Sequence, residues 1–379
     1  MPHATCNRWP RLAATLFFAL AAAPGVAAPP GVIDTAPPGA RAVPSGDGRW
    51  LAPHTVTIPG SGVRFAMQPY PAGDGFGPGW IGRCEVTWGE YRQYMRLCDA
   101  FGRFDDAGLR AITDANRVDA VTAPSKLYDP SFTLAAGDAP GLPAVSMSQY
   151  AAKQYTKWLS LLTGQFYRLP SGREWEHACR AGAVGRAPSN GGAAWLNRYA
   201  WHDGNSDGET KPVGQKLPNA WGLHDMHGNA WEWVLDASAG QAVDPDGPGG
   251  EPPVAWPTAL HPRALRGGSV MTPPGELSFA ALRHSDDASW SSYDPNTPTS
   301  PWWFASDAAL DVGFRVLRPY HTPPRQRQEV YWRAGVASVE RAADLRIDRE
   351  GRGARGVVDP GLPGALDALR SKRQPGPRH

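Results

Sequence analysis

The sequence has few cysteines, few long apolar runs and almost equal numbers of positive and negative charges. It has 4 Cys among 379 residues, and charged residues make up 20% of the chain with a net charge of +2. This balance gives no whole-chain argument for binding nucleic acid. No segment after residue 28 is apolar for the roughly 20 residues that a membrane-spanning helix needs. The sequence therefore predicts neither a nucleic-acid partner nor a transmembrane span.

Turn-forming and aromatic residues are abundant instead. The chain has 43 Gly, 39 Pro and 16 Trp, with few long periodic stretches. Glycine and proline at this frequency interrupt regular elements, so the composition favours a loop-rich α+β domain over a helical bundle or a doubly wound sheet.

The N-terminal residues 1–28 have the pattern of a cleavable secretory signal. Arg8 and Arg11 precede an apolar run that is too short to span a bilayer, and small residues follow it up to Ala28. We therefore expect a secreted or periplasmic protein. Residues 29–53 are expected to form a flexible linker and residues 54–320 the folded domain. The Arg-rich residues 321–379 are expected to be a mostly disordered basic tail.

Removing the signal leaves Cys84, Cys98 and Cys179, an odd number for an exported protein. We expect all three to be small core residues. A Cys84–Cys179 disulfide is the alternative.

Two capping boxes locate helices. Thr87 with Glu90, and Ser171 with Glu174, have the spacing that lets each side chain satisfy the other residue's backbone N–H. A third helix is expected over residues 148–162, where apolar residues form one stripe before Gly164. Glu174 could also be a catalytic acid, but the cap explains it more simply. Strands are expected near residues 54–58 and 81–86, and residues 101–142 form a long excursion.

The most informative stretch is Asn219-Ala-Trp-Gly-Leu-His-Asp-Met-His-Gly-Asn-Ala-Trp-Glu-Trp233. It is too rich in turn formers for a helix and too aromatic for a solvated loop. It resembles the signature of the formylglycine-generating enzyme, or sulfatase-modifying factor, family. Further matches keep the family's order, namely Glu85-Val-Thr87, Pro143-Ala-Val-Ser146, Tyr167-Arg-Leu-Pro-Ser171, Arg266-Gly-Gly-Ser269 and Gly313-Phe-Arg-Val316. The resemblance implies a C-type-lectin-like α+β fold with short antiparallel strands and a few helices.

The resemblance also bears on metals. It implies a structural calcium ion held by Glu232, by Asn229 and by carbonyls of the turn between His227 and Ala230, and carboxylate and carbonyl oxygens are suitable calcium ligands. The family's oxidising enzyme binds copper and the substrate thiol with two cysteines, whose positions here fall on Thr272 and Leu277. Neither side chain can replace a thiolate that selects Cu(I). Copper is therefore not expected, and catalysis stays an open question.

A binding groove is the remaining candidate site. If the family's cleft persists, its floor is the segment from Ser269 to Leu277, which includes Thr272, and its rim comes from aromatic residues of three loops: Tyr128, Trp290, Trp302 and Trp303. Flat rings can stack on a peptide or a sugar. The alternatives are that Tyr128 pins a surface loop and that the tryptophans fill the core.

Two classes of function remain from sequence alone. One is an exported maturation or accessory factor that binds a protein or peptide partner. The other is a non-catalytic, lectin-like recognition module for glycans or peptides, and an oxidase with a different metal site is a further alternative.

Overall fold

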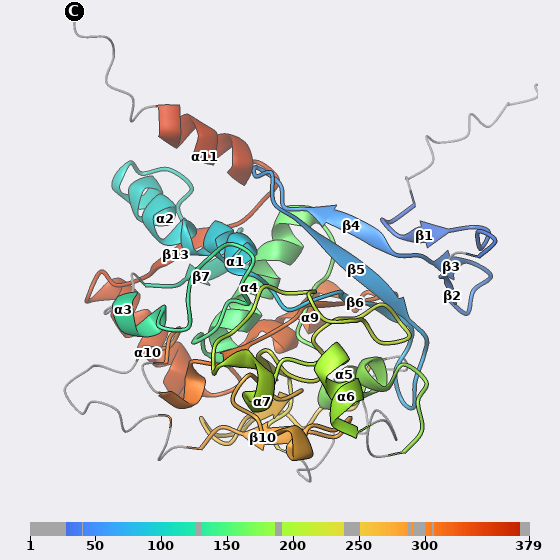
Figure 1. Ribbon diagram of the computed structural model, residues 1–379. Helices are drawn as coiled ribbons and strands as arrows, with labels where there is room; N and C mark the ends of the chain where they lie inside the picture. The colour runs from blue at the N-terminus through green and yellow to red at the C-terminus, as the bar shows by residue number, and fades with distance from the viewer. Residues whose placement is uncertain are drawn as a thin grey trace, which may run out of the picture.

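The computed structural model describes residues 28–39, 41–125, 130–185, 192–238, 251–286, 290, 300–304 and 307–371. Helices, short strands and long connections alternate along this chain, with helices packed among the sheets rather than in a separate layer (Figure 1). This is the loop-rich, C-type-lectin-like α+β fold that the sequence predicts. Among the described residues, no helix combines the length and the apolar character needed to cross a bilayer.

Two four-stranded sheets organise the domain. In the first, the strand order is β12-β6-β5-β4, and all neighbours are antiparallel. In the second, the order is β10-β9-β8-β11, and the β11–β8 pair is parallel. The strands of these two sheets are β4 (His54–Thr57), β5 (Arg64–Tyr70), β6 (Gly79–Gly82), β8 (Trp231–Trp233), β9 (Ala264–Arg266), β10 (Leu282–His284), β11 (Val312–Gly313) and β12 (Leu317–Pro319). The predicted strand at 54–58 is confirmed, whereas the one predicted at 81–86 begins and ends earlier.

The predicted helices begin where their caps place them. The Thr87–Glu90 box caps α1, the Ser171–Glu174 box caps α5, and Ser148 caps α4, which ends at the left-handed Gly164. The helices of the family-like region are α1 (Trp88–Met95), α2 (Leu97–Asp106), α3 (Pro130–Thr133), α4 (Gln149–Thr163), α5 (Gly172–Arg180), α6 (Gly192–Tyr199) and α7 (Asp203–Ser206), with 3-10 turns η1 (Arg117–Asp119), η2 (Pro274–Glu276) and η3 (Asp307–Ala309).

Glu174 has a structural role. Besides the cap, it forms an ion pair at 2.7 Å with Arg168, and both side chains are at most 2% exposed. The cap interpretation is confirmed, and the carboxylate has a buried partner as well.

The segment expected to be a flexible linker, residues 29–53, is folded where it is described. It forms a three-stranded antiparallel sheet in the order β1-β3-β2, from β1 (Val32–Ile33), β2 (Val43–Pro44) and β3 (Trp50–Leu51). Val32, Val43 and Leu51, one apolar side chain from each strand, are buried. Burial of these few residues outweighs the proline- and glycine-rich composition on which the prediction rested.

The C-terminal segment also differs from its prediction. Residues 325–371 form α9 (Arg325–Trp332), α10 (Ala337–Asp348), β13 (Ala354–Val357) and α11 (Leu362–Ser371). Strand β13 pairs antiparallel with β7 (Ala120–Ala123), so this part of the C-terminal segment lies beside the long excursion (Figure 1). Trp332 is 2% exposed and its Nε1 donates to the Tyr167 carbonyl at 2.9 Å. The burial of the Trp332 indole and the pairing of β13 with β7 give regular structure to a segment whose Arg-rich composition is typical of disordered chains.

The three cysteines of the folded part form no disulfide. Cys179 is buried in the core as predicted, while Cys84 and Cys98 are half-buried. The alternative Cys84–Cys179 disulfide is not formed. Burial raises the pKa of the Cys84 thiol to about 12, which keeps it protonated and unreactive at neutral pH.

Lys153 gives a testable pH dependence. It lies on α4, is fully buried, and donates from Nζ to the Arg333 carbonyl at 3.2 Å. Burial lowers its pKa to about 7, so between pH 7 and its unfolded value near 10.4 the unfolded chain binds a proton that the folded chain does not. Stability should therefore rise with pH across this window.

The variant Lys153→Met should flatten this rise and increase the free energy of unfolding at pH 7. Urea unfolding at pH 7, 8 and 9 measures both effects. Lys211→Met provides the control, because the Lys211 side chain is 22% exposed and pairs with the exposed Glu209. An unchanged pH slope in Lys153→Met would contradict the burial argument.

Candidate functional site

The signature segment, residues 219–233, folds into successive tight turns that end in β8. The Asn219 side chain accepts from the backbone N–H of Trp221 and Leu223, and thereby closes the first turn. A Cβ at Gly228 would lie 1.9 Å from the Trp201 carbonyl oxygen, so only glycine fits there. Asn229 has a left-handed φ of 64°. The glycine and asparagine of the signature are thus required by the backbone path.

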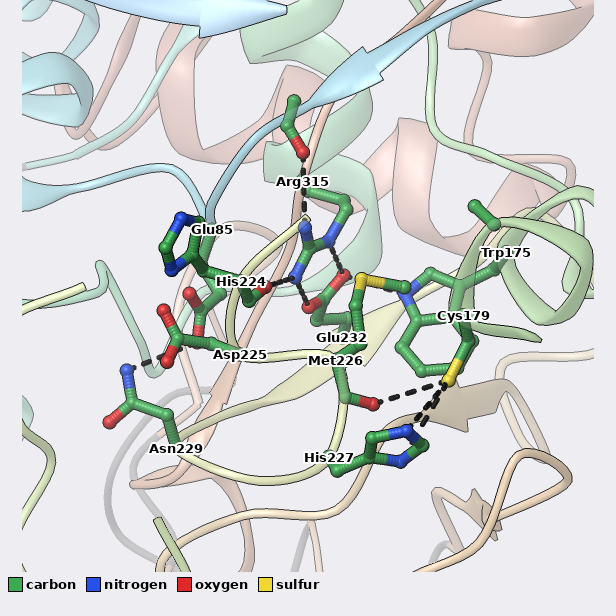
Figure 2. A network of polar contacts seen from close by, with 12 residues as sticks. Glu85, Trp175, Cys179, His224, Asp225, Met226, His227, Asn229, Glu232 and Arg315 are labelled. Carbon is green, nitrogen blue, oxygen red and sulfur yellow. Dashed lines mark hydrogen bonds and ion pairs between the residues drawn. The ribbon is translucent and has the colours of Figure 1, made fainter. Parts of the chain in front are cut away.

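A buried ion pair holds the end of this segment. The Arg315 guanidinium donates to Glu232 from Nε at 2.6 Å and from Nη2 at 2.5 Å, and Trp175 Nε1 donates to the same carboxylate at 2.7 Å (Figure 2). Both Arg315 and Glu232 are 0% exposed. Arg315 also donates to the carbonyls of Gly82 and His224. It therefore connects β6, the signature and β8.

Two further carboxylates lie next to this pair. Glu85 Oε1 accepts from Asn229 Nδ2 at 3.1 Å (Figure 2). Asp225 Oδ2 accepts from the Gly214 N–H at 2.7 Å. Their other oxygens, Glu85 Oε2 and Asp225 Oδ1, have no hydrogen-bond donor among the described residues. Burial raises the pKa of both carboxyls, and for Glu85 the neighbouring Asp225 adds to the effect. The charge of the pair is thereby disfavoured.

The histidines of the signature do not form a shared metal face. His227 lies against Cys179, with Sγ 3.6 Å from Nε2 (Figure 2). His224 Nδ1 lies 2.8 Å from the Lys216 carbonyl. Burial lowers the pKa of His227 to about 4 and raises that of Cys179. A neutral thiol beside a neutral imidazole is not an activated nucleophile, because the thiolate is the reactive form.

Thr272 and Leu277, the two positions predicted to replace the family's cysteines, come together in this fold. A Cβ built on Gly268 would lie 2.2 Å from Leu277 Cδ2 and 3.5 Å from Thr272 Oγ1, so both side chains surround the same glycine. Thr272 Oγ1 accepts from the Ser269 N–H at 2.9 Å. Leu277 packs with Leu196 of α6 and is 6% exposed. A bonded hydroxyl and a packed aliphatic side chain do not fit a copper site.

Ser269 is buried rather than open to a groove. Its hydroxyl donates to Asp311. The pKa of Asp311 is raised, because burial has a larger effect than this bond and Arg283, which lower it. Ser269 Oγ also accepts from the Met271 N–H at 3.1 Å. Met271 itself is 58% exposed. The predicted floor residues Ser269, Thr272 and Leu277 therefore cluster, but their side chains face inward.

The tryptophans predicted to form the rim of the groove are buried in the structure. Trp290, Trp302 and Trp303 are buried at 3%, 0% and 6% exposure, and Tyr128 lies outside the described residues. The C-terminal segment covers Trp302, since a Cβ at Gly353 would lie 2.5 Å from its ring. Trp303 stacks on Trp88 with ring centroids 6.4 Å apart. The alternative, that these tryptophans fill the core, matches their burial.

Trp302→Ala is accordingly expected to lower the free energy of unfolding by about 3 to 5 kcal/mol, as buried aromatic residues do. Chemical denaturation measures it. The partly exposed Trp195→Ala should cost clearly less. A Trp302→Ala protein as stable as the parent would restore Trp302 as a groove residue.

The calcium prediction involves residues with other partners. Both oxygens of Glu232 accept from Arg315, and Asn229 bonds to Glu85 and to the backbone of Lys211. Within the described ranges, no three His, Cys, Asp or Glu side chains form a group that could hold a metal ion. A carboxylate paired in this way is poorly suited to calcium. Calcium binding at Asn229 and Glu232 stays a prediction.

Sequence reasoning missed Glu85, Asp225 and Asp311 as partners. Glu85 and Asp225 lie in matched motifs, so the motifs could have indicated them. No motif contains Asp311, and only the fold brings it to Ser269.

Comparison with known proteins adds the context of this site. Residues 41–319 match the model of the "Sulfatase-modifying factor enzyme 1-like domain". The Mycobacterium tuberculosis formylglycine-generating enzyme is 32% identical over 152 residues, which cover 36% of this chain and 49% of the relative. A Bos taurus protein named "Inactive C-alpha-formylglycine-generating enzyme 2" is 34% identical over 114 residues, 27% of this chain and 35% of that one.

Among solved structures, Treponema denticola variable protein 1 superposes with a TM-score of 0.46 and 19% identity, covering 70% of this chain and 99% of that chain. The chain spans about half or less of the length of these two curated relatives.

Proposed function

The chain belongs to the family of sulfatase-modifying factor enzyme 1-like domains, and from this membership we propose that it is an exported maturation or accessory factor. In this proposal it binds a protein or peptide partner and does not oxidise cysteine through a copper–thiolate centre. The observation that carries the proposal is the convergence of Thr272 and Leu277 around Gly268, where two thiolates would be needed.

Other features support the same assignment. The family description refers to enzymes that modify another protein, a sulfatase, which supports a protein or peptide as the partner. A relative with a similar degree of identity is named as inactive. In this chain, the buried thiol nearest the signature, Cys179, has a raised pKa and a neutral histidine beside it. None of these groups provides an oxidising centre.

Metal analysis of the protein purified from the exported fraction tests the proposal. An accessory factor should contain far less than one copper or iron per chain, with a formylglycine-generating enzyme purified in parallel as the positive control. Stoichiometric copper or iron would contradict the proposal and favour an oxidase that uses a different metal site.

A further inference from the structure

A polar pocket of about 500 Å³ lies between the domain and its C-terminal segment. Helix α4, the turn η1 and strand β7 supply one side, and α9, α10 and β13 supply the other. Its volume is within the range of roughly 300 to 1,000 Å³ that small-molecule sites occupy. None of its lining residues belongs to the segment from Ser269 to Leu277.

The floor of the pocket is a fixed set of buried polar groups. Thr122, Tyr150 and Gln154 are 8%, 8% and 6% exposed. The Thr122 hydroxyl lies 3.0 Å from the Tyr150 hydroxyl, and Gln154 Oε1 accepts from the Thr122 N–H at 3.1 Å. Gln154 Nε2 donates to the Trp332 carbonyl at 3.0 Å. These bonds connect the floor to the C-terminal segment, so the pocket is preorganised.

The walls carry charges of both signs, and most of these charges have a partner of opposite sign. Lys157 is bonded to Glu329 at 3.0 Å, Arg355 is bonded to Asp344, and Arg117 pairs with Asp114 at 3.6 Å. Within the part of the chain that the structure describes, the side chains of Arg333 and Glu340 form no ion pair and no hydrogen bond, although both line the pocket. One cation and one anion therefore remain available to a ligand.

This balance selects a class of ligand. A polyanion would be repelled by the unpaired Glu340, and a polycation by the unpaired Arg333. A ligand with one carboxylate and one ammonium can pair with Arg333 and Glu340, because guanidinium and carboxylate groups form strong charge-assisted hydrogen bonds. The hydroxyl and amide groups of the floor can bond to peptide groups.

We propose that this pocket binds a small zwitterion of the amino-acid or short-peptide class, with Arg333 receiving the carboxylate and Glu340 the ammonium. The inference does not depend on the proposed function, since Arg333 and Glu340, the two residues that select the ligand, lie beyond the family-like residues 41–319.

Isothermal titration calorimetry with the full-length protein tests it, with alanyl-alanine as the probe and its N-acetylated, C-amidated form as the blocked control. The free dipeptide should bind and the blocked one should bind about tenfold or more weakly, because blocking removes both charges. No heat of binding for the free dipeptide up to about 10 mM, or equal binding of both peptides, would overturn the proposal.

Variants of the two charged residues supply the second readout. Arg333→Ala and Glu340→Gln should each weaken binding of the free dipeptide about tenfold or more. Arg333 and Glu340 are both exposed. Arg349 is also exposed but does not line the pocket, so Arg349→Ala is the control and should bind the dipeptide as the parent does. Melting temperatures equal to that of the parent establish folding, and parent-like affinity in both pocket variants would contradict the assignment.

Discussion

The variant Arg315→Ala is expected to lower the free energy of unfolding by about 3 to 5 kcal/mol, because it leaves Glu232 charged and buried without its partner. Glu232 is 0% exposed, and two of its three hydrogen bonds come from Arg315. The same variant leaves the carbonyls of Gly82 and His224 without their guanidinium donor. Urea unfolding monitored by tryptophan fluorescence measures the loss.

A surface ion pair provides the matched control for this prediction. Arg92 pairs with Asp138, and their side chains are 33% and 50% exposed. Arg92→Ala should change stability by less than about 1 kcal/mol, since solvent screens exposed pairs. If Arg315→Ala is as mild as Arg92→Ala, the ion pair does not anchor the signature. A melting temperature that rises with calcium in the parent but not in Glu232→Ala would show that Glu232 binds calcium instead.

Cysteines can be placed at positions 272 and 277, where the family resemblance expects a pair of thiols. The double variant Thr272→Cys, Leu277→Cys, kept reduced, is expected to bind about one Cu(I) per chain, whereas the parent binds none at these positions. The two side chains surround Gly268, so thiolates placed there would lie close enough to share a soft ion. Competition with a chromophoric Cu(I) chelator measures the affinity.

A variant with serine at both positions controls for the altered packing. Replacing Leu277 removes contacts with Leu196, so both double variants should lose some stability. Only the cysteine pair should gain copper. Failure of the folded cysteine variant to bind Cu(I) would mean that positions 272 and 277 are not where the family holds its metal.

The sequence predicted best those features that depend on neighbours along the chain. Both capping boxes begin a helix, and the left-handed Gly164 ends one, where local spacing placed them, because each uses groups within one turn. The prediction that Thr272 and Leu277 occupy the family's cysteine positions came from the resemblance around Arg266-Gly-Gly-Ser269. Their convergence on Gly268 required the structure.

Features that depend on distant contacts were predicted less well. The C-terminal segment is Arg-rich, yet Trp332 bonds to Tyr167 and β13 pairs with β7. From the sequence alone, Trp302 suits a groove and the core equally well. Gly353, which covers its ring, belongs to the same C-terminal segment. Composition describes a segment in isolation, whereas burial here comes from residues far apart in sequence.

The central claim is that this chain does not make formylglycine by the cysteine–copper route, and one measurement tests it most directly. The parent protein is incubated with Cu(I), oxygen and a cysteine-containing sulfatase peptide, and mass spectrometry follows the conversion of the thiol to the aldehyde. A formylglycine-generating enzyme is run in parallel as the positive control. The account predicts an unchanged peptide mass, and turnover of the peptide by the parent protein would contradict it.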